Sequence, residues 1–159
     1  MDLLLWAVRA LHVFSVATWL GGFVFQYAII QPIARSEGGE ALHAAGMMSK
    51  RFLGFMWASL WTMAATGLLM MVLSPRFIWF RYIDTWSILL RLKQIVFLLM
   101  VLCSVGYGRM IRYLQSPASN GGFDERAELY RLRVIRYRKM SIALGVVGLL
   151  LAAGLRLAV

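Results

Sequence analysis

Residues 3–30 read LLLWAVRALHVFSVATWLGGFVFQYAII, an apolar stretch that carries the basic residues Arg9 and His12 near its start. Roughly 20 apolar residues in a helix span a bilayer core, so this stretch is long enough to cross a membrane. Ionisable side chains are costly inside a bilayer, and a histidine there indicates a functional site. The stretch therefore predicts a membrane span with a site inside it.

On a helix, residues three or four positions apart lie on one face. The face that contains the histidine carries the polar and small side chains of the stretch, namely Arg9, His12, Ser15, Trp19, Gly22 and Gln26. The opposite face is apolar and carries Leu5, Val13, Ala17, Leu20 and Val24. We therefore expect the polar face to point into the protein and the apolar face to contact lipid.

The composition indicates an integral membrane protein. Of the 159 residues, 61% are hydrophobic and only 7 are acidic, with a mean hydropathy of +0.72. Soluble domains are about half apolar. The net charge of +10 comes from basic residues beside the apolar stretches, which favours anionic lipid headgroups over nucleic acid as partners. The single cysteine, Cys103, excludes an intrachain disulfide, and the first residues lack the basic region of a cleavable signal.

The predicted fold is an all-α integral membrane protein, with residues 1–159 forming one four-helix bundle. Four stretches are expected to span the membrane: 3–30, 52–73, 86–113 and 134–157. Proline cannot continue a helix, so the first three should end at Pro32, Pro75 and Pro117. The residues 40–50 have helical spacing and should extend the second helix, and the last helix should start near Glu125.

Lysine and arginine predict the orientation. They gather in the first and third connections, which share one side of the membrane: Arg35, Lys50, Arg51, Arg109, Arg112, Arg126, Arg131, Arg133, Arg136, Arg138 and Lys139. The second connection carries Arg76 and Arg81. The positive-inside rule places the first group in the cytoplasm, so both termini are expected on the periplasmic side of a bacterial inner membrane.

A ligand-binding constellation is predicted in the outer half of this bundle. The ionisable and sulfur-bearing side chains at that level are His12, Lys93, Arg9, Arg91, Arg156, Met70 and Met71. The acids near enough to neutralise the cations are Asp2 and Asp84. Because unpaired cations are costly in a low dielectric, we expect a dianionic ligand. Heme b meets this need, since it has two propionates and an iron that histidine ligates.

Each residue of the constellation has an expected role toward heme. His12 would be an axial ligand, with Met70, Met71, Lys93 or a residue of another subunit as the second. The propionates would bind to the side chains of Arg9, Arg91 and Arg156, and Trp19 would pack against the ring. Two alternatives remain open: the arginines reach lipid headgroups, and His12 carries a proton.

Two further patterns lie in the second and fourth predicted spans. Small residues share one face of the fourth span, at Ser141, Gly145, Gly148 and Ala152, and they allow close approach of another helix or of a porphyrin plane. Methionines recur every seventh residue in the second span, at Met56, Met63 and Met70. Thioethers bind cuprous copper, but methionine also fills gaps in apolar cores.

Several short motifs carry a family resemblance: Leu11-His12, Trp19-Leu20-Gly21-Gly22, Pro32, Arg51-Phe52, Thr66-Gly67-Leu68 and Leu92-Lys93. They resemble the copper-resistance protein D (CopD) family of membrane proteins, whose members are associated with copper uptake. The related HemJ-type protoporphyrinogen oxidases have four helices, bind heme b and use a histidine in the first helix and a lysine in the third. The resemblance implies these roles for His12 and Lys93.

The leading hypothesis is a b-type heme protein that moves electrons between a quinol or porphyrin-like reductant and a redox partner. One alternative is a CopD-type copper permease. Another is a HemJ-like oxidase in which Lys93 is catalytic. The last is a cofactor-free accessory subunit of a respiratory complex. Homodimerisation or incorporation into a larger redox complex is compatible with each of them.

Overall fold

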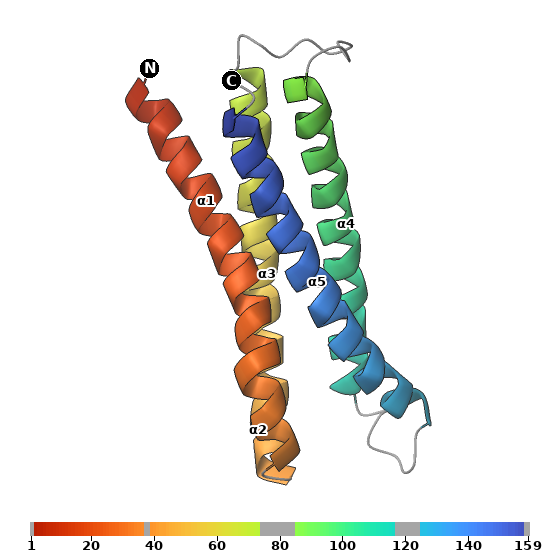
Figure 1. Ribbon diagram of the computed structural model, residues 1–159. Coiled ribbons are helices and arrows are strands. Elements are labelled where there is room, and N and C mark those ends of the chain that lie inside the picture. Colours follow the sequence, from red (N-terminus) through yellow and green to blue (C-terminus); the bar gives the residue numbers. More distant parts are fainter. Residues whose placement is uncertain (1, 37–38, 74–84, 117–124, 158–159) are drawn as a thin grey trace.

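The computed structural model describes residues 2–36, 39–73, 85–116 and 125–157, and nearly all of them are helical. The elements are α1 (Asp2–Phe25), the π-helix η1 (Gln26–Ile30), α2 (Gln31–Ser36), α3 (Gly39–Val72), α4 (Thr85–Leu114) and α5 (Glu125–Leu157). The long helices run side by side, and α1 begins at the end of the bundle where α5 ends (Figure 1). The predicted all-α class is confirmed.

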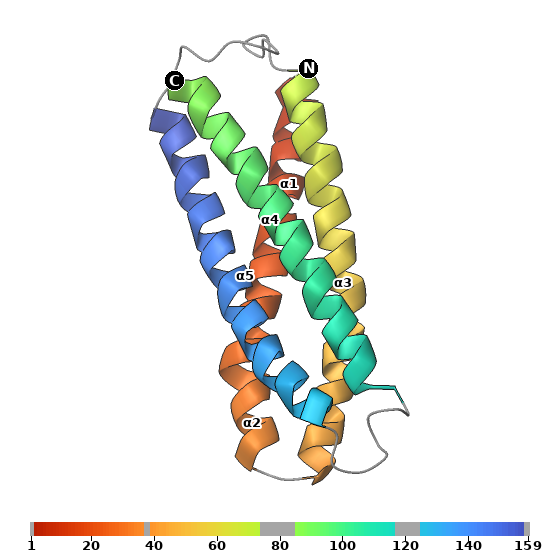
Figure 2. The same cartoon turned by 90° about the vertical axis from the view of Figure 1, so that its right-hand side faces the viewer.

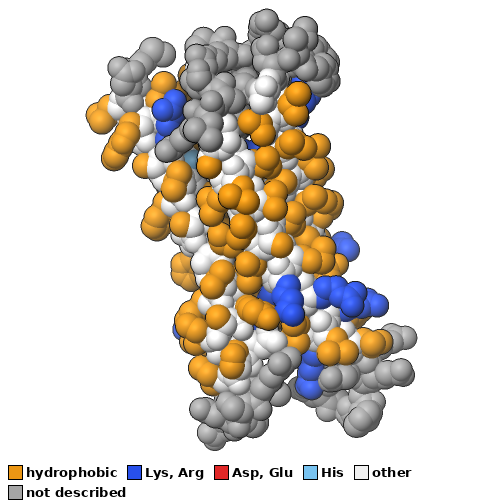
Figure 3. Space-filling model, viewed as in Figure 1, with side chains coloured by type: hydrophobic (Ala, Val, Ile, Leu, Met, Phe, Trp, Pro, Cys, Tyr) orange, Lys and Arg blue, Asp and Glu red, His pale blue; other side chains and the backbone are white. Residues whose placement is uncertain are grey.

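Among the described residues, three helical stretches are long and apolar enough to cross a membrane: Leu3–Ile33, His43–Val72 and Ser87–Leu114. They overlap the first three predicted spans. Within the described residues α5 is not among these stretches, and its apolar part lies between Lys139 and Arg156. Hydrophobic side chains cover the middle of the molecule (Figure 3), and Trp6 and Trp61 are 68% and 72% exposed. Such a surface suits contact with lipid.

The bundle consists of two helix pairs. Helix α1 packs along α3 and α4 packs along α5, while α1–α5 and α3–α4 contacts join the pairs (Figure 1, Figure 2). Aromatic rings fill the centre, with Phe23 packed edge-on at 4.8 Å from Trp19 and 5.2 Å from Tyr107, between ring centroids. Trp19, Phe23 and Tyr107 are completely buried. Edge-to-face pairs of this kind contribute about 0.5–1.5 kcal/mol beyond area burial.

The expected end of the first helix at Pro32 is wrong. Proline lacks an N–H and its ring clashes with the carbonyl four residues earlier in a regular α-helix. Here the wider π-turn of η1 precedes it, with the Gln31 N–H bonded to the Gln26 carbonyl. Pro32 is therefore the second residue of α2, and the helical path continues to Ser36.

Other predicted boundaries agree with the structure. Helix α3 begins at Gly39, so residues 40–50 extend the second helix as expected, and α5 begins at Glu125. Pro75 and Pro117 lie outside the described residues. The small face of α5 packs on a helix: a Cβ added to Gly145 would lie 2.7 Å from Leu20 Cδ1 of α1.

Candidate functional site

The imidazole of His12 is held by a hydrogen bond between α1 and α3. Its Nδ1 lies 2.8 Å from Thr66 Oγ1. The Thr66 hydroxyl donates its single proton back to its own helix, to the Thr62 carbonyl at 2.5 Å, with the Met63 carbonyl at 3.3 Å. The hydroxyl must therefore accept the hydrogen bond from His12 Nδ1–H. This tautomer leaves the lone pair of Nε2 available to a metal ion or a proton.

Gly67, the residue after Thr66, lies beside the same ring. A Cβ added there would lie 3.5 Å from His12 Cε1, in ordinary van der Waals contact. The Thr66-Gly67 pair thus supplies both the hydrogen-bond acceptor of the imidazole and the backbone surface beside it. Sequence reasoning found this pair only through the family resemblance.

The ammonium of Lys93 lies within electrostatic range of the His12 ring, so α4 contributes to the same site. The side chain is half-buried. No residue in the described part of the chain accepts a hydrogen bond from it. The side chains of Asp2 and Asp84, the acids expected nearby, lie outside the described residues. The site thus places the imidazole of His12 within electrostatic range of a cation that has no anionic neighbour among the described residues.

The other predicted site residues differ in their surroundings. Arg9 is exposed, Arg91 is half-buried, and the Arg156 side chain lies outside the described residues. Trp19 is enclosed in the aromatic centre, on the same face of α1 as His12 and farther along the helix. Its predicted contact with a heme ring stays a prediction.

The methionines fall into two groups. Met56 and Met63 are buried in the hydrophobic core, where they pack against its aromatic centre. Met70 and Met71 are half-buried near the end of α3, and Met71 Sδ accepts a hydrogen bond from Gln94 Nε2 at 3.3 Å. Among the described residues, no group of three or more His, Cys, Asp or Glu side chains is placed to hold a metal ion.

A second polar cluster, around Arg138, was missed by the sequence analysis, which treated this residue as a charge outside the membrane. Arg138 is only 7% exposed. Its Nη2 donates to Gln26 Oε1 at 3.0 Å, to Ser49 Oγ at 3.3 Å and to Tyr107 OH at 3.5 Å. Its Nη1 donates to the Gln26 carbonyl at 3.4 Å. One guanidinium on α5 thus joins η1, α3 and α4.

Two sequence signals pointed toward this cluster. Arg138 lies three and seven residues before Ser141 and Gly145, so it shares the small-residue face of α5 that packs inward. Gln26 lies on the polar face of the first stretch. The partners come from four separate elements, and neither signal identifies the pairing by itself.

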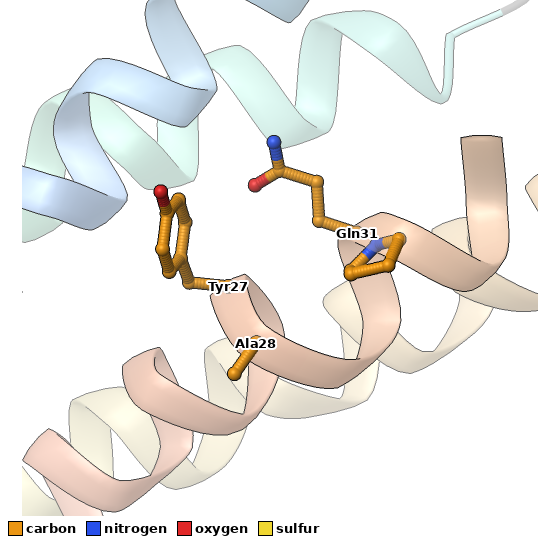
Figure 4. A pocket seen from close by; sticks show the side chains of 4 residues that line it. Tyr27, Ala28 and Gln31 are labelled. Carbon is orange, nitrogen blue, oxygen red and sulfur yellow. The ribbon is translucent and has the colours of Figure 1, made fainter.

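A surface pocket of about 350 Å³ adjoins this cluster and is lined by Tyr27, Ala28, Gln31 and Pro32. The Tyr27 and Gln31 side chains point to the same side of the helix (Figure 4). Lys139, the residue after Arg138, places its Nζ 5.7 Å from the centroid of the Tyr27 ring.

The fold and the two polar clusters together define a helical protein with three helices able to span a membrane and with ionisable groups in its interior. Comparison of the chain with protein-family models, with curated proteins and with solved structures gives no match.

Proposed function

We propose that this chain is a four-span protein of the bacterial inner membrane that binds heme b through His12 and takes part in electron transfer. The observation that carries the proposal is the His12–Thr66 hydrogen bond. It assigns the ring proton of a neutral His12 to Nδ1 and so leaves the Nε2 lone pair for a metal, which is the form in which histidine ligates iron. A porphyrin supplies four iron ligands, so a single protein histidine is sufficient to anchor it.

The surrounding residues fit such a group. Lys93 provides a cation beside His12 without a described carboxylate partner, and a propionate would neutralise it. Thr66 holds the ring orientation, and Gly67 leaves the ring edge free of side-chain bulk. Arg9, Arg91 and Arg156 belong to the same end of the bundle and are further candidates for the propionates. Heme b, when bound, supplies one-electron redox chemistry.

The orientation proposed from the basic residues places this site toward the periplasm, with both termini on that side. A quinol in the bilayer is then a reductant of suitable location. A second axial ligand would come from Met70, Met71, Lys93 or a second copy of the chain. An axial ligand from a second copy of the chain would require a homodimer or a larger redox complex.

The test uses the two histidines as a matched pair. The protein, expressed with added heme precursor and purified in detergent, should show a Soret band. His12→Ala should abolish the band. His43→Ala should leave it unchanged, because His43 is exposed at the opposite end of α3. A wild-type protein without a Soret band, or equal loss in both variants, would overturn the proposal.

A HemJ-like protoporphyrinogen oxidase is the second candidate, and the proximity of Lys93 to His12 favours it. In this case Lys93 would be a catalytic group that takes up a substrate proton. Lys93→Met should then abolish complementation of a strain lacking this oxidase while leaving the Soret band in place. Failure of the wild-type chain to complement would exclude the oxidase and leave heme binding untouched.

A further inference from the structure

The pocket formed by η1 and α2 lies at the level where a membrane ends. In the sequence, the first apolar stretch gives way to a basic residue at Arg35, four positions after Gln31 of the pocket. On the opposing helix, Lys139 directly precedes the apolar part of α5. Basic side chains gather at this end of the bundle and the hydrophobic belt lies beyond them (Figure 3). The pocket therefore faces the lipid headgroup region.

The polar groups of the pocket define the chemistry of a ligand. Lys139 is exposed and lies over the Tyr27 ring, so its charge is presented at the pocket and is available to an anion. Gln31 Oε1 is buried and has no hydrogen-bond partner among the described residues. An unpaired buried acceptor costs free energy, which a donor from a ligand would recover. A ligand with both an anionic group and a hydroxyl satisfies both residues.

The apolar surroundings indicate a lipid rather than a soluble molecule. Ile29 and Ile33, which flank the pocket residues in sequence, are 47% and 42% exposed on the helix exterior. Phe25 is 44% exposed one turn before Ile29. These exposed side chains give the segment that carries the pocket an apolar exterior, which suits a membrane surface. The pocket volume of about 350 Å³ suits a glycerophosphate-sized headgroup.

The pocket wall is held in place from inside the protein. Tyr27 and Ala28 belong to the π-turn, and Arg138 Nη1 donates to the Gln26 carbonyl that closes this turn. The buried guanidinium thus fixes the backbone that presents Tyr27, while the adjacent Lys139 points outward. Arg138 is a positioning residue in this arrangement and does not contact the ligand.

We propose that this pocket binds the headgroup of an anionic phospholipid that carries hydroxyl groups, with Lys139 contacting the phosphate and Gln31 accepting a hydrogen bond from a hydroxyl. The site is separate from His12 and does not depend on heme. With the orientation proposed above, it belongs to the cytoplasmic leaflet.

The experiment measures lipid binding by native mass spectrometry of the full chain released from nanodiscs that contain phosphatidylcholine and a titrated anionic lipid. Phosphatidylglycerol and phosphatidylmethanol both carry one phosphodiester charge, but only the first has headgroup hydroxyls. The chain should retain phosphatidylglycerol in preference to phosphatidylmethanol. Lys139→Gln should weaken binding of both by about tenfold, as expected for loss of a charged hydrogen bond. Gln31→Leu should remove the preference between them.

Lys50→Gln is the matched control. Lys50 follows Ser49 of the Arg138 cluster, as Lys139 follows Arg138, so it is an exposed lysine at similar depth and its loss removes the same charge. An equal effect of Lys50→Gln and Lys139→Gln would show diffuse attraction to a basic protein and overturn the site. Displacement of the lipid by millimolar inorganic phosphate would also overturn it, since the source would then be a soluble anion. Both lysine variants should keep the Soret band, and His12→Ala should keep the lipid, so the two proposals fail independently.

Discussion

Thr66 determines which nitrogen of His12 is available for chemistry. Its hydroxyl has one proton, and the short contact to the Thr62 carbonyl uses it. The hydroxyl oxygen therefore receives the Nδ1–H, and Nε2 is left with its lone pair. A residue of α3 thus sets the tautomer of a neutral imidazole on α1. Outer partners of this kind typically contribute 10- to 100-fold to metal affinity.

Thr66→Val should therefore weaken heme binding by roughly tenfold or more, because valine keeps the shape of threonine but cannot accept from His12. Heme titration of the apoprotein, followed in the Soret region, measures the effect. Thr62→Val is the control, since the Thr62 hydroxyl bonds to the Ala58 carbonyl of its own helix at 2.9 Å. Equal affinities for the Thr66 and Thr62 variants would contradict the role assigned to Thr66.

Arg138 illustrates a second effect at the scale of one side chain, because its planar fork reaches Gln26, Ser49 and Tyr107 together. Lysine keeps the charge but presents a point donor that cannot reach this set of acceptors. Lysine can keep part of the four hydrogen bonds of Arg138. Loss of two or three of them, at roughly 0.6 kcal/mol each, suggests that Arg138→Lys lowers the free energy of unfolding by about 1–2 kcal/mol. The Lys variant still buries a positive charge. The cost of desolvating that charge therefore remains and does not compensate for the lost hydrogen bonds.

Unfolding in mixed detergent micelles measures the stability of the Arg138→Lys variant. Arg136→Lys, on the exposed side of α5, should change stability by less than about 0.5 kcal/mol. A stability of Arg138→Lys indistinguishable from that of Arg136→Lys would mean that the fork geometry contributes nothing.

At the scale of helices, two adjacent glycines of α1 have opposite surroundings. A Cβ on Gly22 would lie within 3.0 Å of three atoms of the Phe52 ring of α3, whereas a Cβ on Gly21 meets nothing within 4 Å. Gly22 thus permits the close approach of α1 and α3 that aligns His12 with Thr66. Gly21 has no such function in the packing.

Gly21→Ala should stabilise the protein by up to about 1 kcal/mol, because alanine favours the helix over glycine and fills open space. Gly22→Ala should destabilise it by about 1–3 kcal/mol, since the rigid Phe52 ring must move and the gain in helix propensity is outweighed. Thermal unfolding of both variants measures these two changes in stability. A stabilising Gly22→Ala would show that α1 and α3 are less tightly packed than described.

The helices themselves could be predicted because long apolar runs and their breaks are local features of the sequence. The π-turn at Gln26 could not. Its first carbonyl, that of Gln26, also accepts a hydrogen bond from Arg138, which lies 112 residues away and which no local pattern connects to it. Without knowledge of the π-turn, Pro32 was expected to end a helix that continues past it. Depth counting placed His12 and Lys93 at one level, but it gave no information on the Thr66 partner, which depends on helix rotation.

At the scale of the whole molecule, the number of spans depends on α5. Its basic first half and its short apolar second half make it a poorer span than the other three, yet it packs along α4 and ends at the same end of the bundle at which α1 begins (Figure 1). The buried Arg138 offers a reason: the guanidinium is bound inside the bundle and does not face lipid. An arginine satisfied in this way lengthens the part of α5 that the membrane tolerates.

Reporter fusions distinguish a chain that crosses the membrane three times from one that crosses it four times. With the basic connections in the cytoplasm, three spans would leave the C-terminus in the cytoplasm, and the crossing of α5 returns it to the periplasm. Alkaline phosphatase, which is active only after export, should therefore be active when fused after residue 159 and inactive when fused after Gln115. Inactivity of both fusions would mean that α5 lies along the membrane surface. Activity after Gln115 would mean that the whole chain is inverted and that the proposed lipid site faces the other leaflet.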